Sequence, residues 1–155
     1  MNSKRTFEMA AAFLTEMRRD LERAAVEGSD LPPRIRSVHE RAGHATPEYR
    51  TLAVPVQDDM GGQSPEILSE AIARYAVSKR PDCLFLVLDA VTMSPEGAEQ
   101  PVLIAEARDR LGTRLFFVQP YRADGQRVDW DEPIEGGWRD PGKEEMILDA
   151  AFPSS

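Results

Sequence analysis

The chain has 155 residues, 41% of them apolar and 30% charged, which favours one globular domain with its own hydrophobic core. Its 27 acidic and 19 basic residues give a net charge of −8, which argues against general DNA or RNA binding because phosphate repels an acidic surface. The longest apolar run, CLFLVL, is far shorter than the roughly 20 residues of a membrane-spanning helix, and the single cysteine, Cys83, excludes an intramolecular disulfide. We therefore expect a single domain over residues 1–155, located in the cytoplasm, with Cys83 buried in a strand.

The first predicted element is a helix over about residues 6–27. Apolar side chains recur along it every three or four positions and so fall on one stripe, and Gly28 follows as a natural stop. We expect the stripe to pack on the domain's own sheet. Pairing with a partner helix is the alternative, which the alanines in the stripe weaken. The stripe comprises Phe7, Ala10, Leu14, Met17, Leu21 and Ala24.

A short strand around Ile35 and Val38 in LPPRIRSVH and a clearer one in EYRTLAVPV are predicted to form a hairpin, with Pro55 favouring an edge or terminal position for the second strand. The loop between them holds both histidines, His39 and His44. In a zinc-protease helix the two histidines are four positions apart, whereas here they are five apart and Gly43 breaks any helix between them. We interpret the loop as a polar turn, with a metal site at the two histidines as the alternative.

A second helix is predicted from Pro65 to about Lys79, with Ser64 as its N-cap. The turn before it, QDDMGGQ, places glycines ahead of a helix N-terminus, which is one way to bind phosphate. Its two aspartates would repel the anion, however, and Pro65 removes one backbone donor. The turn interpretation is therefore favoured.

Four strands are predicted after this helix: PDCLFLVLDAV, PVLIAEARD, TRLFFVQPYR and RVDWD. Short turns such as ADGQ join them, so neighbouring strands run antiparallel. Residues 132–152 are predicted to form an irregular segment and a short helix that Asp140 caps. The order of elements predicts an α+β fold: an antiparallel β-meander of about four strands plus an N-terminal hairpin, packed against two main helices and a short C-terminal helix.

The progression from an amphipathic helix into PDCLFLVLDAVTM and on to FFVQPYRADGQ resembles a group of small bacterial proteins with no established activity. In that group the buried strand ends in a small residue, an acid, Ala and Trp. Leu88, Asp89, Ala90 and Val91 stand at these positions here, so the acid and the Ala match and the Trp does not. The resemblance covers residues 50–131 and implies an α+β fold without implying an activity.

Acidic residues on the meander are the candidates for catalysis. Asp89 ends a buried strand and Glu106 lies on the next one, with Asp82 as a further acid, which is reminiscent of nucleases whose carboxylates hold Mg²⁺. Such enzymes follow the second acid with a lysine two positions on, and Arg108 stands there instead, which cannot be deprotonated. A divalent-metal-dependent hydrolase or nuclease is therefore the alternative function, and it requires Asp89 and Glu106 to converge. Otherwise we expect Glu106 to face solvent and to pair with an arginine such as Arg114.

Residues 124–155 are rich in acids and contain Trp130, Trp138 and Phe152. Exposed aromatic residues among acids are typical of a protein-docking patch, whereas buried tryptophans would hold this segment on the sheet. The chain shows no G-x-S-x-G motif and no cofactor motif. We therefore predict a non-catalytic module, without a cofactor, that binds a protein partner or forms a homodimer, with these three aromatic residues as binding candidates.

Overall fold

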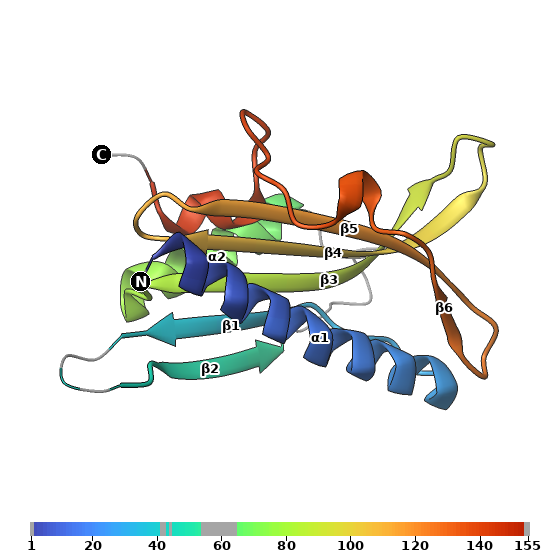
Figure 1. The fold of residues 1–155 in the computed structure, drawn as a ribbon, viewed down its shortest axis with the longest axis horizontal. Helices are drawn as coiled ribbons and strands as arrows, with labels where there is room; N and C mark the ends of the chain where they lie inside the picture. The colour runs from blue at the N-terminus through green and yellow to red at the C-terminus, as the bar shows by residue number, and fades with distance from the viewer. Residues whose placement is uncertain (1, 41–42, 44, 54–64, 154–155) are drawn as a thin grey trace.

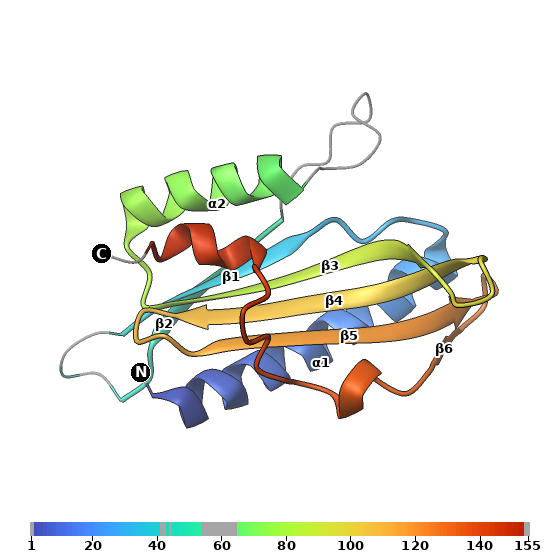
Figure 2. The same cartoon turned by 90° about the horizontal axis from the view of Figure 1, so that it is seen from above.

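The computed structural model describes residues 2–40, 43, 45–53 and 65–153. They form an antiparallel sheet in the order β2-β1-β3-β4-β5-β6, with α1 on one face and α2 on the other (Figures 1 and 2). The strands are β1 (Arg34–His39), β2 (Glu48–Ala53), β3 (Cys83–Met93), β4 (Glu99–Asp109), β5 (Arg114–Ala123) and β6 (Val128–Trp130). The helices are α1 (Ser3–Glu27), α2 (Pro65–Lys79) and the short 3-10 helices η2 (Ile134–Gly136) and η3 (Ile147–Ala151).

The predicted α+β class is confirmed. β3 to β6 form the expected meander, and β1 pairs antiparallel with β3, so the predicted hairpin belongs to the same sheet. β2 is an edge strand, as its proline predicted. None of the helices in the described part of the chain is long and apolar enough to cross a membrane.

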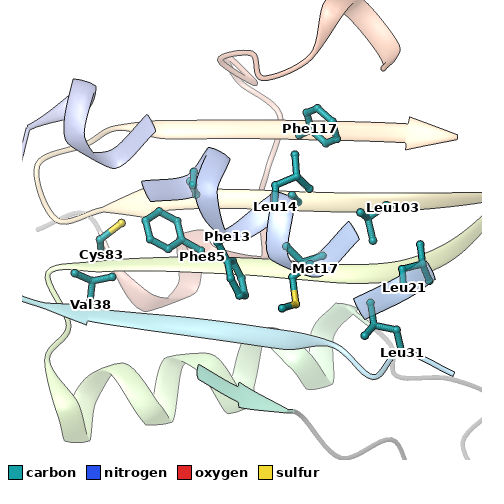
Figure 3. Close-up of a cluster of buried hydrophobic side chains, with 14 of the residues drawn as sticks. Phe13, Leu14, Met17, Leu21, Leu31, Val38, Cys83, Phe85, Leu103 and Phe117 are labelled. Atoms are coloured by element: carbon teal, nitrogen blue, oxygen red, sulfur yellow. The ribbon is translucent and has the colours of Figure 1, made fainter. Parts of the chain in front are cut away.

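α1 packs along one face of the sheet, as its apolar stripe predicted. Asn2 caps its start by accepting a hydrogen bond from the Arg5 N–H at 2.8 Å, and Gly28 ends it in the left-handed conformation at φ 70°. Phe13 contacts Phe85 of β3 at 6.3 Å between ring centroids in the centre of this core (Figure 3). Burying one such side chain contributes about 1.5–3 kcal/mol.

Two details of the predicted stripe differ from the structure. Phe7 is 45% exposed, whereas Phe13, which lies outside the predicted stripe, is 1% exposed. The helix begins at Ser3 and presents Thr6 to the sheet in place of Phe7, because the Thr6 hydroxyl donates to the buried Asp109 carboxylate at 2.8 Å. Cys83 is buried in this core, as predicted for a small hydrophobic side chain.

The opposite face of the sheet is covered by α2 and η3 (Figure 2). Alternation along the strands sends the even-numbered residues of β3 to this side, where they meet one face of α2. The buried members of this second core are Ile35, Leu68, Ile72, Leu84, Leu86 and Leu148.

The predicted C-terminal helix is much shorter than expected. Asp140 accepts a hydrogen bond from the Gly142 N–H at 2.7 Å, so it stabilises a turn, and the helical part begins only at Ile147. Pro141 and Gly142 favour this turn over a helix start, since Gly142 has a positive φ of 63°. The predicted cap Ser64 lies outside the described residues.

Candidate functional site

Asp89 and Glu106 lie on opposite faces of the sheet. Asp89 pairs with Leu103 across β3 and β4 and points to the α1 side, where the Tyr121 hydroxyl donates to it at 2.5 Å. Glu106 pairs with Leu86 and points to the α2 side. The register of the sheet therefore keeps the Asp89 and Glu106 carboxylates apart, so the two cannot hold one metal ion as the predicted hydrolase site requires.

Glu106 holds the C-terminal segment in place. Its side chain is 3% exposed, and its two carboxylate oxygens accept the backbone N–H groups of Ile147 at 3.1 Å and Leu148 at 2.9 Å. Burial raises the pKa of Glu106, and these two hydrogen bonds oppose that increase because they favour the charged form. The expectation that Glu106 faces solvent and pairs with Arg114 is wrong, because η3 covers it.

The other two acids of this region also have structural partners. Asp82 accepts the backbone N–H of Glu40 at 2.7 Å and lies 3.9 Å from Arg110. Asp109 is fully buried and accepts hydrogen bonds from the N–H groups of Leu111 and Thr113, both at 2.9 Å, as well as from the Thr6 hydroxyl. Asp109 thus fixes the turn between β4 and β5.

Among the described residues, no cluster of three or more His, Cys, Asp or Glu side chains is arranged to bind a metal ion. His39, at the end of β1, donates from Nε2 to the carbonyl oxygen of Lys79 at 2.8 Å. Since Lys79 ends α2, this bond satisfies one of the helix's terminal carbonyl groups. His44 lies outside the described residues.

The two tryptophans are half-buried and pack on the α1 side of the sheet. The Trp130 ring lies 5.4 Å from the Tyr121 ring, and its indole N–H donates to Glu22 at 2.8 Å. The Trp138 ring lies 5.2 Å from the Phe117 ring. Both tryptophans therefore hold the segment after β5 on the sheet.

Phe152 occupies a different environment at the end of η3. The Arg108 guanidinium lies 5.4 Å from the centre of its ring and donates to its carbonyl oxygen at 3.3 Å. Arg108 also reaches Asp149, which accepts two hydrogen bonds from Arg114 at 2.9 and 2.7 Å. Burial alone would raise the pKa of Asp149, but the hydrogen bonds from Arg114 and the backbone outweigh it and lower that pKa.

Beside Phe152 is a groove of about 640 Å³, which we call the arginine groove. It lies at the end of the sheet where the last turn of α2, the β4–β5 turn and the chain after η3 come together (Figure 2). Among the described residues that line it there is no aspartate or glutamate, although the chain carries a net charge of −8. The lining consists of Ala76, Val77, Arg80, Pro81, Arg108, Arg110, Leu111, Gly112, Ala151, Phe152 and Pro153.

The three arginines of the groove differ in whether their guanidinium groups already have hydrogen-bond or ion-pair partners within the fold. Arg108 is 12% exposed and bound to Asp149. Arg110 is 52% exposed and donates to the carbonyl oxygens of Arg80 and Pro81 at 3.0 and 2.9 Å. The Arg80 guanidinium has no hydrogen-bond or ion-pair partner among the described residues. Arg80 therefore offers the groove's most available positive charge.

Apolar side chains border these charges. Val77 is 79% exposed and Leu111 is 73% exposed, the largest exposures among the large hydrophobic residues in the described part of the chain. Neither residue stands out in the sequence, since the groove joins segments that are distant along the chain. A local signal existed in each case: Val77 directly follows Ala76, the last buried residue of α2, and Leu111 is an aliphatic residue in a tight turn.

Comparisons with protein-family models, with curated proteins and with solved structures found no match to this chain. Its function must therefore be inferred from its own residues and their geometry.

Proposed function

We propose that the chain is a non-catalytic protein-interaction module and that the arginine groove is its binding surface. The observation that carries this proposal is the pairing of the exposed side chains of Val77 and Leu111 with three arginines in one groove. Protein interfaces are enriched in arginine and aromatic residues, and their centres bury apolar side chains that monomers would otherwise expose to water. Phe152, one of the predicted binding residues, borders the same groove.

The apolar part of the groove supports a macromolecular partner. Val77 stands on the last turn of α2. Leu111 stands on the β4–β5 turn, where Asp109 accepts the N–H groups of Leu111 and Thr113. A partner side chain that lies between Val77 and Leu111 would remove both from water. Full burial of one such aliphatic side chain contributes about 1.5–3 kcal/mol before the costs of association.

The charges of the groove support an acidic partner. Arg80 faces solvent next to the aliphatic residues and has no ion-pair partner among the described residues, and Arg110 stays 52% exposed although it lies 3.9 Å from Asp82. Complementary charge at a protein interface raises the association rate and selects between partners. An acidic segment with an aliphatic anchor matches both features.

The environments of the other polar candidates support a non-catalytic role. Asp89, Glu106 and Asp109 each accept hydrogen bonds that join separate elements of the fold. The raised pKa values of Asp89 and Glu106 have burial as their main cause, and each carboxylate already accepts hydrogen bonds from groups of the fold.

The experiment that tests this proposal is a selection of binding peptides from a random-peptide display library against the folded chain. We expect the selected peptides to be acidic with an aliphatic residue and to bind the Val77→Asp, Leu111→Asp double variant at least about tenfold more weakly. Both substitutions are on exposed side chains, so the fold should be retained.

The matched control is the double variant Val91→Asp, Met93→Asp. It adds the same charge at two other exposed apolar residues, 63% and 62% exposed, at the C-terminal end of β3. The control should bind the peptides like the wild type. Equal binding to the wild type and to the groove variant, or a failure to select any peptide, would overturn the proposal.

A further inference from the structure

We propose that the partner seated in the arginine groove is a second copy of this chain, which inserts residues 131–135, the Ile134 segment. The inference rests on the proposed function and adds the identity of the partner. It requires that the chain itself carry an acidic segment with an exposed aliphatic residue, and residues 131–135 meet this requirement.

The Ile134 segment, with the sequence DEPIE, lies along the chain between β6 and Trp138. Ile134 is 44% exposed, and the Glu132 carboxylate has no hydrogen-bond or ion-pair partner among the described residues. Glu135 is held at a positive φ of 54°, and its ion pair with Arg139 at 3.0 Å fixes the turn that presents Ile134 to solvent. An aliphatic anchor thus stands between two acids on a short, constrained segment.

The segment and the groove are complementary in both chemistry and charge. Ile134 matches the exposed pair of Val77 and Leu111. Glu132 and Arg80 are opposite charges, and neither has a partner within the described chain. A contact between two copies would therefore join one unpaired acid to one unpaired base and bury three exposed aliphatic side chains at once.

The conformation of Arg80 supports a role for its side chain. Arg80 follows the last residue of α2 with a positive φ of 48°, a position that glycine usually occupies because a Cβ is strained there. Its N–H still donates to the Ala76 carbonyl oxygen at 2.8 Å, as in a helix end that glycine terminates. An arginine at this strained position is explained if its guanidinium forms a contact that outweighs the strain.

The groove of one chain is out of reach of its own Ile134 segment. The groove lies at the end of the sheet near the C-terminus, whereas η2 lies beside β5 past the middle of the sheet (Figures 1 and 2). The contact therefore joins two different surfaces of two copies. Two such contacts related by a two-fold axis close a dimer, each copy giving one segment and receiving the other.

The test is sedimentation velocity of the full chain over a concentration series, with a charge swap across the contact. We expect a concentration-dependent dimer in the wild type. Arg80→Glu and Glu132→Arg should each weaken association at least about tenfold, since each places like charges together, and the double variant should recover most of the loss. Arg74→Glu and Glu96→Arg, which make the same charge changes at exposed residues outside both surfaces, should leave association unchanged.

A monomer at all concentrations, or a dimer that Arg80→Glu and Glu132→Arg leave unaffected, would overturn the inference. A fluorescent peptide of residues 129–137 separates this failure from a failure of the proposed function. If display-selected peptides bind the groove while the chain stays monomeric and its own peptide does not bind, the second-copy inference falls and the proposed function stands. If no peptide binds the groove, both fall.

Discussion

Replacing Glu106 by glutamine tests how the C-terminal segment is held to the sheet. The carboxylate accepts two backbone N–H groups, from Ile147 at 3.1 Å and from Leu148 at 2.9 Å. Glutamine has nearly the same shape but only one acceptor oxygen, and its NH₂ group would face the second N–H. Glu106→Gln therefore leaves one backbone N–H of η3 without an acceptor in a site where the side chain is 3% exposed.

The expected cost follows from these contacts. A buried N–H without an acceptor costs about 1–3 kcal/mol. Part of this is offset because glutamine is uncharged and avoids the burial penalty that raises the pKa of Glu106. We expect a net loss of about 1–2 kcal/mol in the free energy of unfolding, which lowers the melting temperature by about 2–8 °C for a domain of this size.

Urea unfolding followed by circular dichroism measures this loss, and amide hydrogen exchange locates it. The Ile147 and Leu148 amides should exchange faster in Glu106→Gln, while amides in the centre of β3 keep their relative protection. Glu99→Gln, an exposed glutamate on the same strand, is the matched control and should change neither quantity. Unchanged stability together with unchanged exchange at Ile147 and Leu148 would refute the anchoring role of Glu106.

Three further predictions follow from single contacts. Arg80→Gly should stabilise the fold by about 0.5–1 kcal/mol in urea unfolding, because it relieves the positive φ of 48°, while Arg80→Ala should give no such gain. Burial raises the pKa of Asp89 above its usual 3.8, with the Tyr121 hydrogen bond opposing, so the folded chain binds this proton more tightly than the unfolded chain. The stability that Asp89 contributes is thus fully present below about pH 4 and is lost as the pH rises through the raised value. In unfolding experiments Asp89→Asn should accordingly gain stability relative to the wild type between about pH 4 and pH 7, and a constant difference would contradict the shift. Burial also raises the pKa of the Cys83 thiol far above its usual value, so a thiol reagent should label Cys83 only after unfolding, and rapid labelling of the native chain would contradict its burial.

Local patterns predicted most of the fold because each is a property of neighbouring residues. The apolar stripe of α1 and the continuous apolar run of β3 both follow from side-chain period, and the Asp124–Gly125 turn follows from backbone preference. The helix expected at Asp140 failed for a similar reason: a proline after an acid is typical of a helix start and equally of a turn, and Gly142 decided for the turn.

The role of Glu106 could not be predicted from its strand. An acid in mid-strand faces solvent by default, and its actual partners, the N–H groups of η3, lie 41 and 42 positions further along the chain. The arginine groove was equally hidden, because residues 76–81, 108–112 and 151–153 meet only when α2 and η3 pack on the same face. Arg80 did leave a signal, since an arginine between a helix end and a proline occupies a position that usually takes glycine.

The central claim is that the arginine groove is the protein-binding surface. Backbone amide NMR spectra of the isotope-labelled chain, recorded with and without a saturating display-selected peptide, test it most directly. We expect the shifted amides to cluster around Val77, Arg80 and Leu111, the three residues that carry the groove's exposed apolar surface and its unpaired charge. Shifts that cluster instead at Val91 and Met93, at the C-terminal end of β3, while the groove amides stay unshifted, would contradict the assignment of the groove as the binding surface.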